Sequence, residues 1–245
     1  MTEPLLNAEG LTKRYGGLLA NDAVDLRIAP GEIRGLIGPN GAGKTTLVNL
    51  LTGVERPDAG RIGLAGADLT GLGPHRIASQ GLVRTFQVAR LFANLSVREN
   101  LIVPFLAADR PGSVREGLAR ADDLLGMARL APLADAPAGT LSGGQRMLLQ
   151  ACAGFMVPDV RLHVLDEPFA GINPVVKDVL ISLIERENAG QARAFLIVSH
   201  EMAIVRRLCP IVTVMVQGRV AAEGSLEEIA RKPEIVAAYL GRAAA

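Results

Sequence analysis

The stretch GPNGAGKT, residues 38–45, decides the fold of this chain of 245 residues. It follows an apolar run at 33–37 and precedes residues 45–51, whose apolar spacing is typical of a helix. A glycine-rich loop between a strand and a helix binds phosphate, because its backbone N–H groups and the helix dipole face the anion. We expect Lys44 to contact the β- and γ-phosphates of a nucleotide and Thr45 to hold Mg²⁺. The candidate binding residues are Gly38, Pro39, Asn40, Gly41, Ala42, Gly43, Lys44, Thr45 and Thr46.

A second motif, RLHVLDE at 161–167, is a mostly apolar strand that ends in two acids. Ligands bind at the carboxyl ends of parallel strands, so Asp166 and Glu167 belong to the candidate site. We expect Asp166 to be a second ligand of Mg²⁺. Glu167 is the candidate general base, because in-line phosphoryl transfer needs a group that deprotonates the attacking water opposite the leaving group.

A third motif, LSGGQ at 141–145, predicts the start of another helix. Ser142 is a good N-cap, and Gln145, three residues on, is placed to close a capping box. The exposed N–H groups of such a helix start form a second anion site. A protein that binds one nucleotide has little use for two phosphate-binding helix starts.

The three motifs together resemble the ATP-binding-cassette (ABC) family of transporter ATPase subunits, over about residues 5–241. The resemblance implies an ATPase with ATP and Mg²⁺ as ligands. It also implies an α/β fold: a P-loop NTPase core with a mostly parallel sheet, an antiparallel β subdomain and an inserted α-helical subdomain. We expect one ABC ATPase domain over residues 1–245. Its predicted parts are the nucleotide-binding core at 1–88 and 158–223, the helical subdomain at 89–157 and a C-terminal helical tail at 224–245.

The resemblance also implies roles for single residues. Tyr15 matches the aromatic residue that stacks on adenine. Gln87 matches the glutamine that senses Mg²⁺ and the attacking water, and His200 matches the histidine that contacts the γ-phosphate. The predicted catalytic residues are therefore Glu167, His200 and Gln87, and the predicted metal ligands are Thr45, Gln87 and Asp166. In this family the signature segment completes the nucleotide site of the opposite subunit; here it is Ser142, Gly143, Gly144 and Gln145.

The spacing of apolar and turn residues predicts further elements. An antiparallel pair at 7–14 and 23–28 is separated by the turn Gly16-Gly17. Strands at 162–165, 194–198, 211–216 and 219–222, with helices between the first three, indicate a parallel sheet. Helices are expected from residue 96 and over about 113–130. A helix over 173–190 has Asn173 as N-cap, Pro174 in its first turn and Gly190 at its end.

Several residues depart from the family pattern or stand apart from its chemistry. Arg34 and His163 replace residues that are normally apolar in core strands, and we expect His163 to be hydrogen-bonded inside the sheet. Ala153 stands where an arginine commonly ends the signature helix. Cys152 and Cys209 are too few and too isolated for a disulfide framework or a metal cluster, so we expect buried, reduced thiols.

Composition excludes some classes of protein. Twenty-six basic residues against 25 acidic ones give a net charge of +1, without the basic field of a protein that binds duplex nucleic acid. No run reaches the roughly 18 to 20 apolar residues of a membrane-spanning helix, and the amino terminus shows no secretory signal. We therefore expect a protein on the cytoplasmic side, with no nucleic-acid partner.

The sequences GLVRTFQ at 81–87 and LSVRENL at 95–101 resemble the ATPase subunits of branched-chain or hydrophobic amino acid importers. That resemblance implies a second ABC ATPase subunit, identical or similar, integral-membrane permeases and, indirectly, a solute-binding protein. It places the chain peripherally on the cytoplasmic face of the inner membrane, with residues 87–108 transmitting closure to a permease. Three alternatives stay open: an importer of urea or short amides, a soluble ABC clamp in DNA repair or translation, and a cassette that does not hydrolyse ATP.

Overall fold

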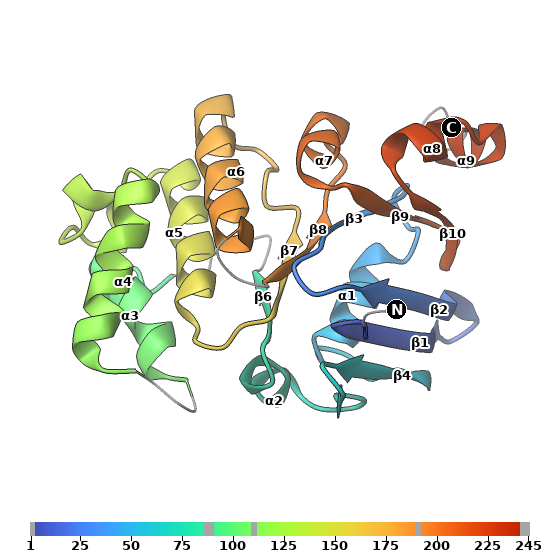
Figure 1. Ribbon diagram of the computed structural model, residues 1–245, viewed down its shortest axis with the longest axis horizontal. Coiled ribbons are helices and arrows are strands. Elements are labelled where there is room, and N and C mark those ends of the chain that lie inside the picture. The colour runs from blue at the N-terminus through green and yellow to red at the C-terminus, as the bar shows by residue number, and fades with distance from the viewer. Residues whose placement is uncertain (1–2, 86–90, 109–111, 190–192, 241–245) are drawn as a thin grey trace.

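The computed structural model describes residues 3–85, 91–108, 112–189 and 193–240, and its elements form two sheets and a group of helices (Figure 1). The larger sheet has six strands in the order β10-β9-β3-β8-β7-β6. Its strands are β3 (Ile33–Ile37), β6 (Leu82–Thr85), β7 (Leu162–Asp166), β8 (Ala194–Val198), β9 (Ile211–Val216) and β10 (Arg219–Gly224). All neighbours pair in parallel except β10, which is antiparallel to β9. The predicted mostly parallel sheet is confirmed.

The central strands of this sheet are fully buried, and they are mostly apolar, with Arg34, His163 and Asp166 as the exceptions. Every residue of β3, β7 and β8 is buried. Parallel sheets are covered on both faces, so their central strands are continuous apolar runs. The connecting helices include α1 (Lys44–Leu51), α6 (Pro174–Ala189) and α7 (Met202–Leu208).

The smaller sheet is antiparallel, with the order β2-β1-β4-β5. Its strands are β1 (Leu6–Tyr15), β2 (Leu18–Ile28), β4 (Ala59–Leu64) and β5 (Ala67–Asp68). The predicted hairpin at the amino terminus is confirmed, with β2 starting earlier than expected. The strands β4 and β5 and the edge strand β6 were not predicted.

The described elements between β6 and β7 are helical. They are α3 (Val97–Leu106), α4 (Val114–Met127), two short 3₁₀ turns (Ala131–Leu133 and Ala138–Thr140) and α5 (Gly143–Met156). In Figure 1 they gather at one end of the molecule, with the antiparallel strands at the other. Three of them begin with a capping box, formed by Ser96 with Glu99, Ser113 with Glu116 and Ser142 with Gln145. The remaining helices are α2 (Pro74–Ser79), α8 (Leu226–Ala230) and α9 (Pro233–Leu240). Within the described residues, no helix has the length and apolar character that crossing a bilayer requires.

The predicted cap of α6 is confirmed. The backbone N–H of Val176 donates to Asn173 Oδ1 at 3.0 Å, and the helix begins at Pro174. Gly190, the expected end of this helix, lies outside the described residues. Cys152 and Cys209 are buried free thiols, as expected, and burial raises the pKa of each to about 12. Such thiols are poor nucleophiles at neutral pH.

Arg34 is accommodated in the core by neutralisation. The guanidinium forms an ion pair with Glu32 and another with Glu223 at 2.8 Å. It also donates to Thr213 Oγ1 at 3.1 Å and to the carbonyl of Arg27 at 3.0 Å. A buried charge is stable only when paired in this way, and these contacts tie β3 to β9 and β10.

The expected hydrogen bond of His163 was wrong. Among the described residues neither ring nitrogen of this fully buried side chain has a hydrogen-bond partner. The ring instead stacks on Phe195 with centroids 5.3 Å apart and meets the edge of Phe155 at 5.1 Å. Contacts with aromatic rings take the place of hydrogen bonds around this imidazole. Burial lowers the pKa of His163 to about 3.

This imidazole predicts a specific loss of stability in acid. The imidazole has a pKa of 6.5 in the unfolded chain and of about 3 in the folded chain. The free energy of unfolding is therefore unaffected by this group above about pH 6.5, and it decreases as the pH falls from about 6.5 to about 3. We expect His163→Phe to remove this contribution. Between pH 7.5 and 5, urea unfolding of the wild type should lose about 2 kcal/mol more than that of the variant. A stability difference between the two proteins that stays constant with pH would contradict this.

Candidate functional site

The phosphate loop is held against both sheets by glycines that leave no room for a side chain. A Cβ on Gly43, whose φ is +95°, would lie 2.4 Å from the carbonyl oxygen of Ala20, and one on Gly38 would lie 2.3 Å from that of Met215. Gly41 has no neighbour within 4 Å of its Cβ position. The loop is therefore fixed from behind and open in front, as a phosphate cradle must be.

Lys44 begins α1 and turns back over the loop. Its Nζ donates to the carbonyl of Gly38 at 2.6 Å and to that of Pro39 at 3.0 Å. Burial lowers the pKa of this ammonium, while the carboxylates of Glu167 and Asp166 act in the opposite direction. The ammonium is thus poised at the loop, where an incoming phosphate offers stronger acceptors than the two carbonyls.

Asp166 and Glu167 stand at the carboxyl end of β7, beside the loop. Asp166 is 8% exposed. Its carboxylate forms an ion pair with the guanidinium of Arg84, in which Nη2 lies 2.6 Å from Oδ2. Glu167 has a φ of +49°, a left-handed conformation that is uncommon for residues other than glycine. Its Oε2 lies 2.9 Å from Nδ1 of His200, which follows β8. The structure therefore brings together the carboxylate and the imidazole that the sequence singled out.

Tyr15 lies at the end of β1 with 44% of its surface exposed. Its hydroxyl donates to the carboxylate of Glu55, and desolvation followed by this hydrogen bond raises the pKa of the phenol. The Lys13 ammonium lies 5.8 Å from the ring centroid. The hydrogen bond of the hydroxyl to Glu55 fixes the ring, and the ring surface stays available for stacking on a nucleotide base.

These groups line one cleft of about 950 Å³. Thr45 and Asp166 both face it, and together they offer a hydroxyl and a carboxylate. Such hard oxygen donors suit Mg²⁺, which keeps several waters and needs few protein ligands. The described lining residues include Tyr15, Asn40, Gly41, Ala42, Gly43, Lys44, Thr45, Thr46, Arg84, Asp166, Glu167 and His200.

Two predicted parts of the site lie elsewhere. None of the described residues that line the cleft comes from the signature segment, residues 142–145. In that segment Ser142 and Gln145 form the expected capping box, and the Cβ position of Gly143 is open. Gln87, the predicted sensor of Mg²⁺ and water, lies outside the described residues.

Sequence reasoning missed three residues that support this cleft. Arg84 stood in a motif used only to choose the family branch, although a basic residue next to a predicted metal site was a usable signal. Asn49 and Glu55 carry no recognisable pattern. Asn49 Oδ1 accepts from Arg84 at 2.7 Å, and its Nδ2 donates to Glu55 at 2.8 Å.

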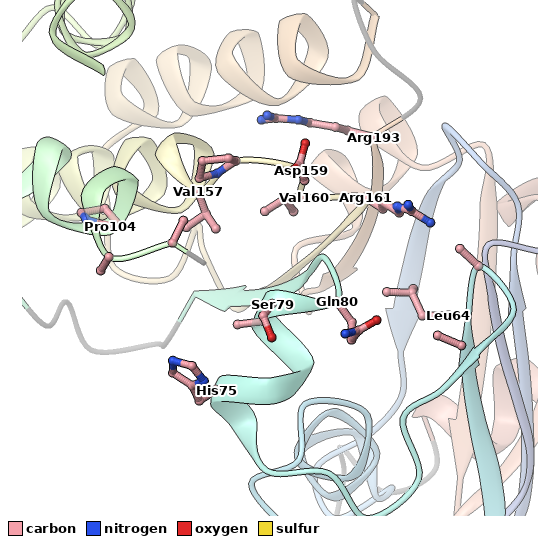
Figure 2. A pocket seen from close by; sticks show the side chains of 16 residues that line it. Leu64, His75, Ser79, Gln80, Pro104, Val157, Asp159, Val160, Arg161 and Arg193 are labelled. Atoms are coloured by element: carbon pink, nitrogen blue, oxygen red, sulfur yellow. The ribbon is translucent and has the colours of Figure 1, made fainter. Parts of the chain in front are cut away.

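A second cleft, of about 1200 Å³, opens between the core and the helices. Figure 2 shows His75, Ser79 and Gln80 on one side, with Pro104 and Val157 across from them. Arg161 and Arg193 add positive charge to its lining. The cleft thus has contributions from α2, from the end of α3 and from the connection between α5 and β7.

The fold and the first cleft define a phosphate-loop nucleotide-binding protein. Residues 21–170 match the model of the ABC transporter family. The chain is 40% identical to the high-affinity branched-chain amino acid transport ATP-binding protein BraF of Pseudomonas aeruginosa, over 99% of this chain and 100% of that protein. Identity to LivG of Escherichia coli K12, which carries the same description, is 39% over the same shares.

A solved structure agrees with these relatives. The ADP conformation of MJ1267, an ATP-binding cassette of an ABC transporter, matches with a TM-score of 0.86 and 30% identity, over 98% of this chain and 100% of that one. The chain therefore belongs to the ABC transporter family and is an ATP-binding cassette.

The loop geometry predicts the effect of removing the Lys44 ammonium. Lys44→Ala takes away a charge-assisted contact to phosphate, so we expect affinity for ATP to fall about 10- to 100-fold. Equilibrium binding of a fluorescent ATP analogue measures this. Lys232→Ala, on an exposed stretch near the carboxyl end, is the matched control and should bind as the wild type does. Equal affinities for the two variants would contradict the assignment of the loop.

Proposed function

We propose that this chain hydrolyses ATP to drive an importer of branched-chain or other hydrophobic amino acids, as one of two cassettes that close around two ATP molecules. One observation carries the dimer: the described lining of the nucleotide cleft contains no residue of the signature segment. A capped helix start with exposed N–H groups then needs a nucleotide from a second copy or a similar subunit. The transport names of BraF and LivG support the solute class over urea or short amides, and transport over a DNA-repair clamp.

The chemistry follows from the cleft. The Glu167 carboxylate takes a proton from water as the water oxygen bonds to the γ-phosphorus and the bond to the bridging oxygen breaks. The His200 contact at 2.9 Å holds Glu167 in place and offers a donor at the γ-phosphate. Lys44 stabilises charge on the β- and γ-phosphates. Mg²⁺, when bound at Thr45 and Asp166 with Gln87, neutralises phosphate charge.

Closure of two such subunits is a binding event. Ser142, Gly143, Gly144 and Gln145 of one copy would seal the ATP held by the loop of the other. A Cβ on Gly144 would lie 3.0 Å from a methyl of Val176 on α6, so the signature helix sits tightly on the core. ATP then joins the subunits, and hydrolysis with phosphate release separates them.

The second cleft is the proposed permease contact. It includes Ala107 and Ala108 at the end of the segment expected to transmit closure. It also borders α2 and Gln80. β6 therefore begins two residues after the lining of the second cleft and reaches the nucleotide cleft at Arg84. We propose that this cleft attaches the chain to permeases at the cytoplasmic face of the inner membrane, with a solute-binding protein as an indirect partner.

Glu167→Gln tests the sandwich. The amide keeps the size of the side chain but cannot accept the proton, so Mg·ATP should bind and stay bound. We expect a stable dimer in sedimentation velocity, by itself or with the second cassette subunit of its transporter, and a fall in phosphate release of at least about 100-fold. A variant that stays monomeric at saturating ATP would exclude the sandwich.

Ser142→Arg in the same background is the matched control. The arginine blocks the helix start that should face the partner's phosphate, so the dimer should be lost. Nucleotide affinity of the monomer should stay within about twofold, because Ser142 lies outside the cleft of its own chain. Dimerisation that survives this change would show that the signature segment does not act across the interface.

Ala107→Arg tests the permease cleft. A long charged side chain at this exposed position fills the second cleft without touching the nucleotide cleft. Co-purification of permeases with the tagged chain from membranes should be lost, while ATP binding is unchanged. Ala119→Arg on the exposed face of α4 should leave co-purification intact. Equal recovery of permeases with both variants would place the contact elsewhere.

A further inference from the structure

Arg84 lies between the metal end and the base end of the nucleotide cleft. Its guanidinium donates to Asp166 on one side and to Asn49 on the other. We propose that Arg84 is a positioning residue for Asp166, and that a polar relay of Arg84, Asn49 and Glu55 couples this carboxylate to Tyr15. The proposal rests on the proposed roles of Asp166 at Mg²⁺ and of Tyr15 at the base. It adds that the metal end and the base end of the cleft are energetically linked.

The sheet itself places Arg84 at Asp166. Arg84 on β6 pairs in parallel register with Val164 on β7. Residues two apart on a strand point to the same face, so Asp166 presents its carboxylate on the face that carries Arg84. The resulting contact is 2.6 Å long, and each of the two side chains is only 10% exposed. Because water screens it little, this ion pair is strong enough to fix a side-chain rotamer.

The contact uses one oxygen of Asp166. Arg84 Nη2 donates to Oδ2, so Oδ1 is the oxygen that we expect to face the metal. Outer partners of this kind orient a ligating carboxylate, and their loss typically lowers metal affinity about 10- to 100-fold. Arg84 therefore acts on the orientation of the Asp166 carboxylate.

The second terminal nitrogen of Arg84, Nη1, begins the relay toward the base end of the cleft. Nη1 donates to Asn49 Oδ1 at 2.7 Å, and Asn49 Nδ2 donates to Glu55 Oε1 at 2.8 Å. A guanidinium only donates, so it fixes which end of the Asn49 amide faces it. The amide N–H then faces Glu55, whose other oxygen accepts the hydroxyl of Tyr15.

Donors and acceptors match at every step of the relay. Tyr15 and Asn49 both donate to Glu55, and Arg84 donates to both Asn49 and Asp166. Asn49 lies on α1, directly after the phosphate loop, so the relay also passes the element that binds phosphate. Because such coupling is reciprocal, a change at Glu55 must alter Mg²⁺ affinity although Glu55 lies at the base end.

The experiment compares nucleotide affinity with and without metal. The apparent Kd of a fluorescent ATP analogue is measured in EDTA and in excess Mg²⁺, and the ratio of the two values is the enhancement by Mg²⁺. Arg84→Gln should lower this ratio about tenfold or more. Arg84→Lys, which keeps the charge and one donor, should recover part of it.

Glu55→Gln should lower the ratio about threefold, and Tyr15→Phe, which keeps the ring but loses the hydroxyl, should act in the same direction. The Arg84→Gln, Glu55→Gln double variant should resemble Arg84→Gln alone, since both changes break one relay. An enhancement unchanged by Arg84→Gln or by Glu55→Gln would overturn the proposal.

Two controls separate this inference from the site it rests on. Arg34→Gln removes an equally buried, ion-paired arginine of another network, so it should lower thermal stability and leave the ratio unchanged. Asp166→Asn must itself lower the ratio. A normal ratio in Asp166→Asn would overturn the metal site, whereas a normal ratio only in Arg84→Gln would overturn the relay.

Discussion

The rest of the structure depends on the close contact of the phosphate loop with the two sheets behind it. The carbonyl oxygens of Ala20 and Met215 lie where side chains of Gly43 and Gly38 would have to be. The antiparallel sheet therefore contributes to the site by backing the loop as well as by carrying Tyr15. Because the loop cannot retreat, Lys44 keeps its position over the loop carbonyls, beside Asp166 and Glu167 at the carboxyl end of β7.

Much of this was readable from the chain, for physical reasons. The strands β8 and β9 have the bounds that were predicted, because a strand buried on both faces is an uninterrupted apolar run. The capping boxes and the Asn173 cap are local hydrogen bonds between residues three apart. β6 was missed because it is short and only partly buried, and β4 because it is only partly buried and interrupted by glycines.

The unpredicted parts of the site depend on pairings between distant segments. Arg84 meets Asp166, 82 positions away, only because β6 and β7 align in one register. Glu55 meets Tyr15 across 40 positions. His163 shows the opposite failure, since a polar residue on a strand favoured a hydrogen bond and the neighbouring phenylalanines supplied ring contacts instead. Local patterns identify which groups are present, and tertiary contacts decide which of them touch.

β6 has a consequence for how movement crosses the molecule. Four residues of strand span about 13 Å and are nearly inextensible, because their backbone is already extended and tied to β7. Such a strand can tilt or slide as a rigid body, but its length does not change when one end is displaced. A displacement of the chain next to α2 would therefore be transmitted along β6 to the ion pair of Arg84 and Asp166 with little loss.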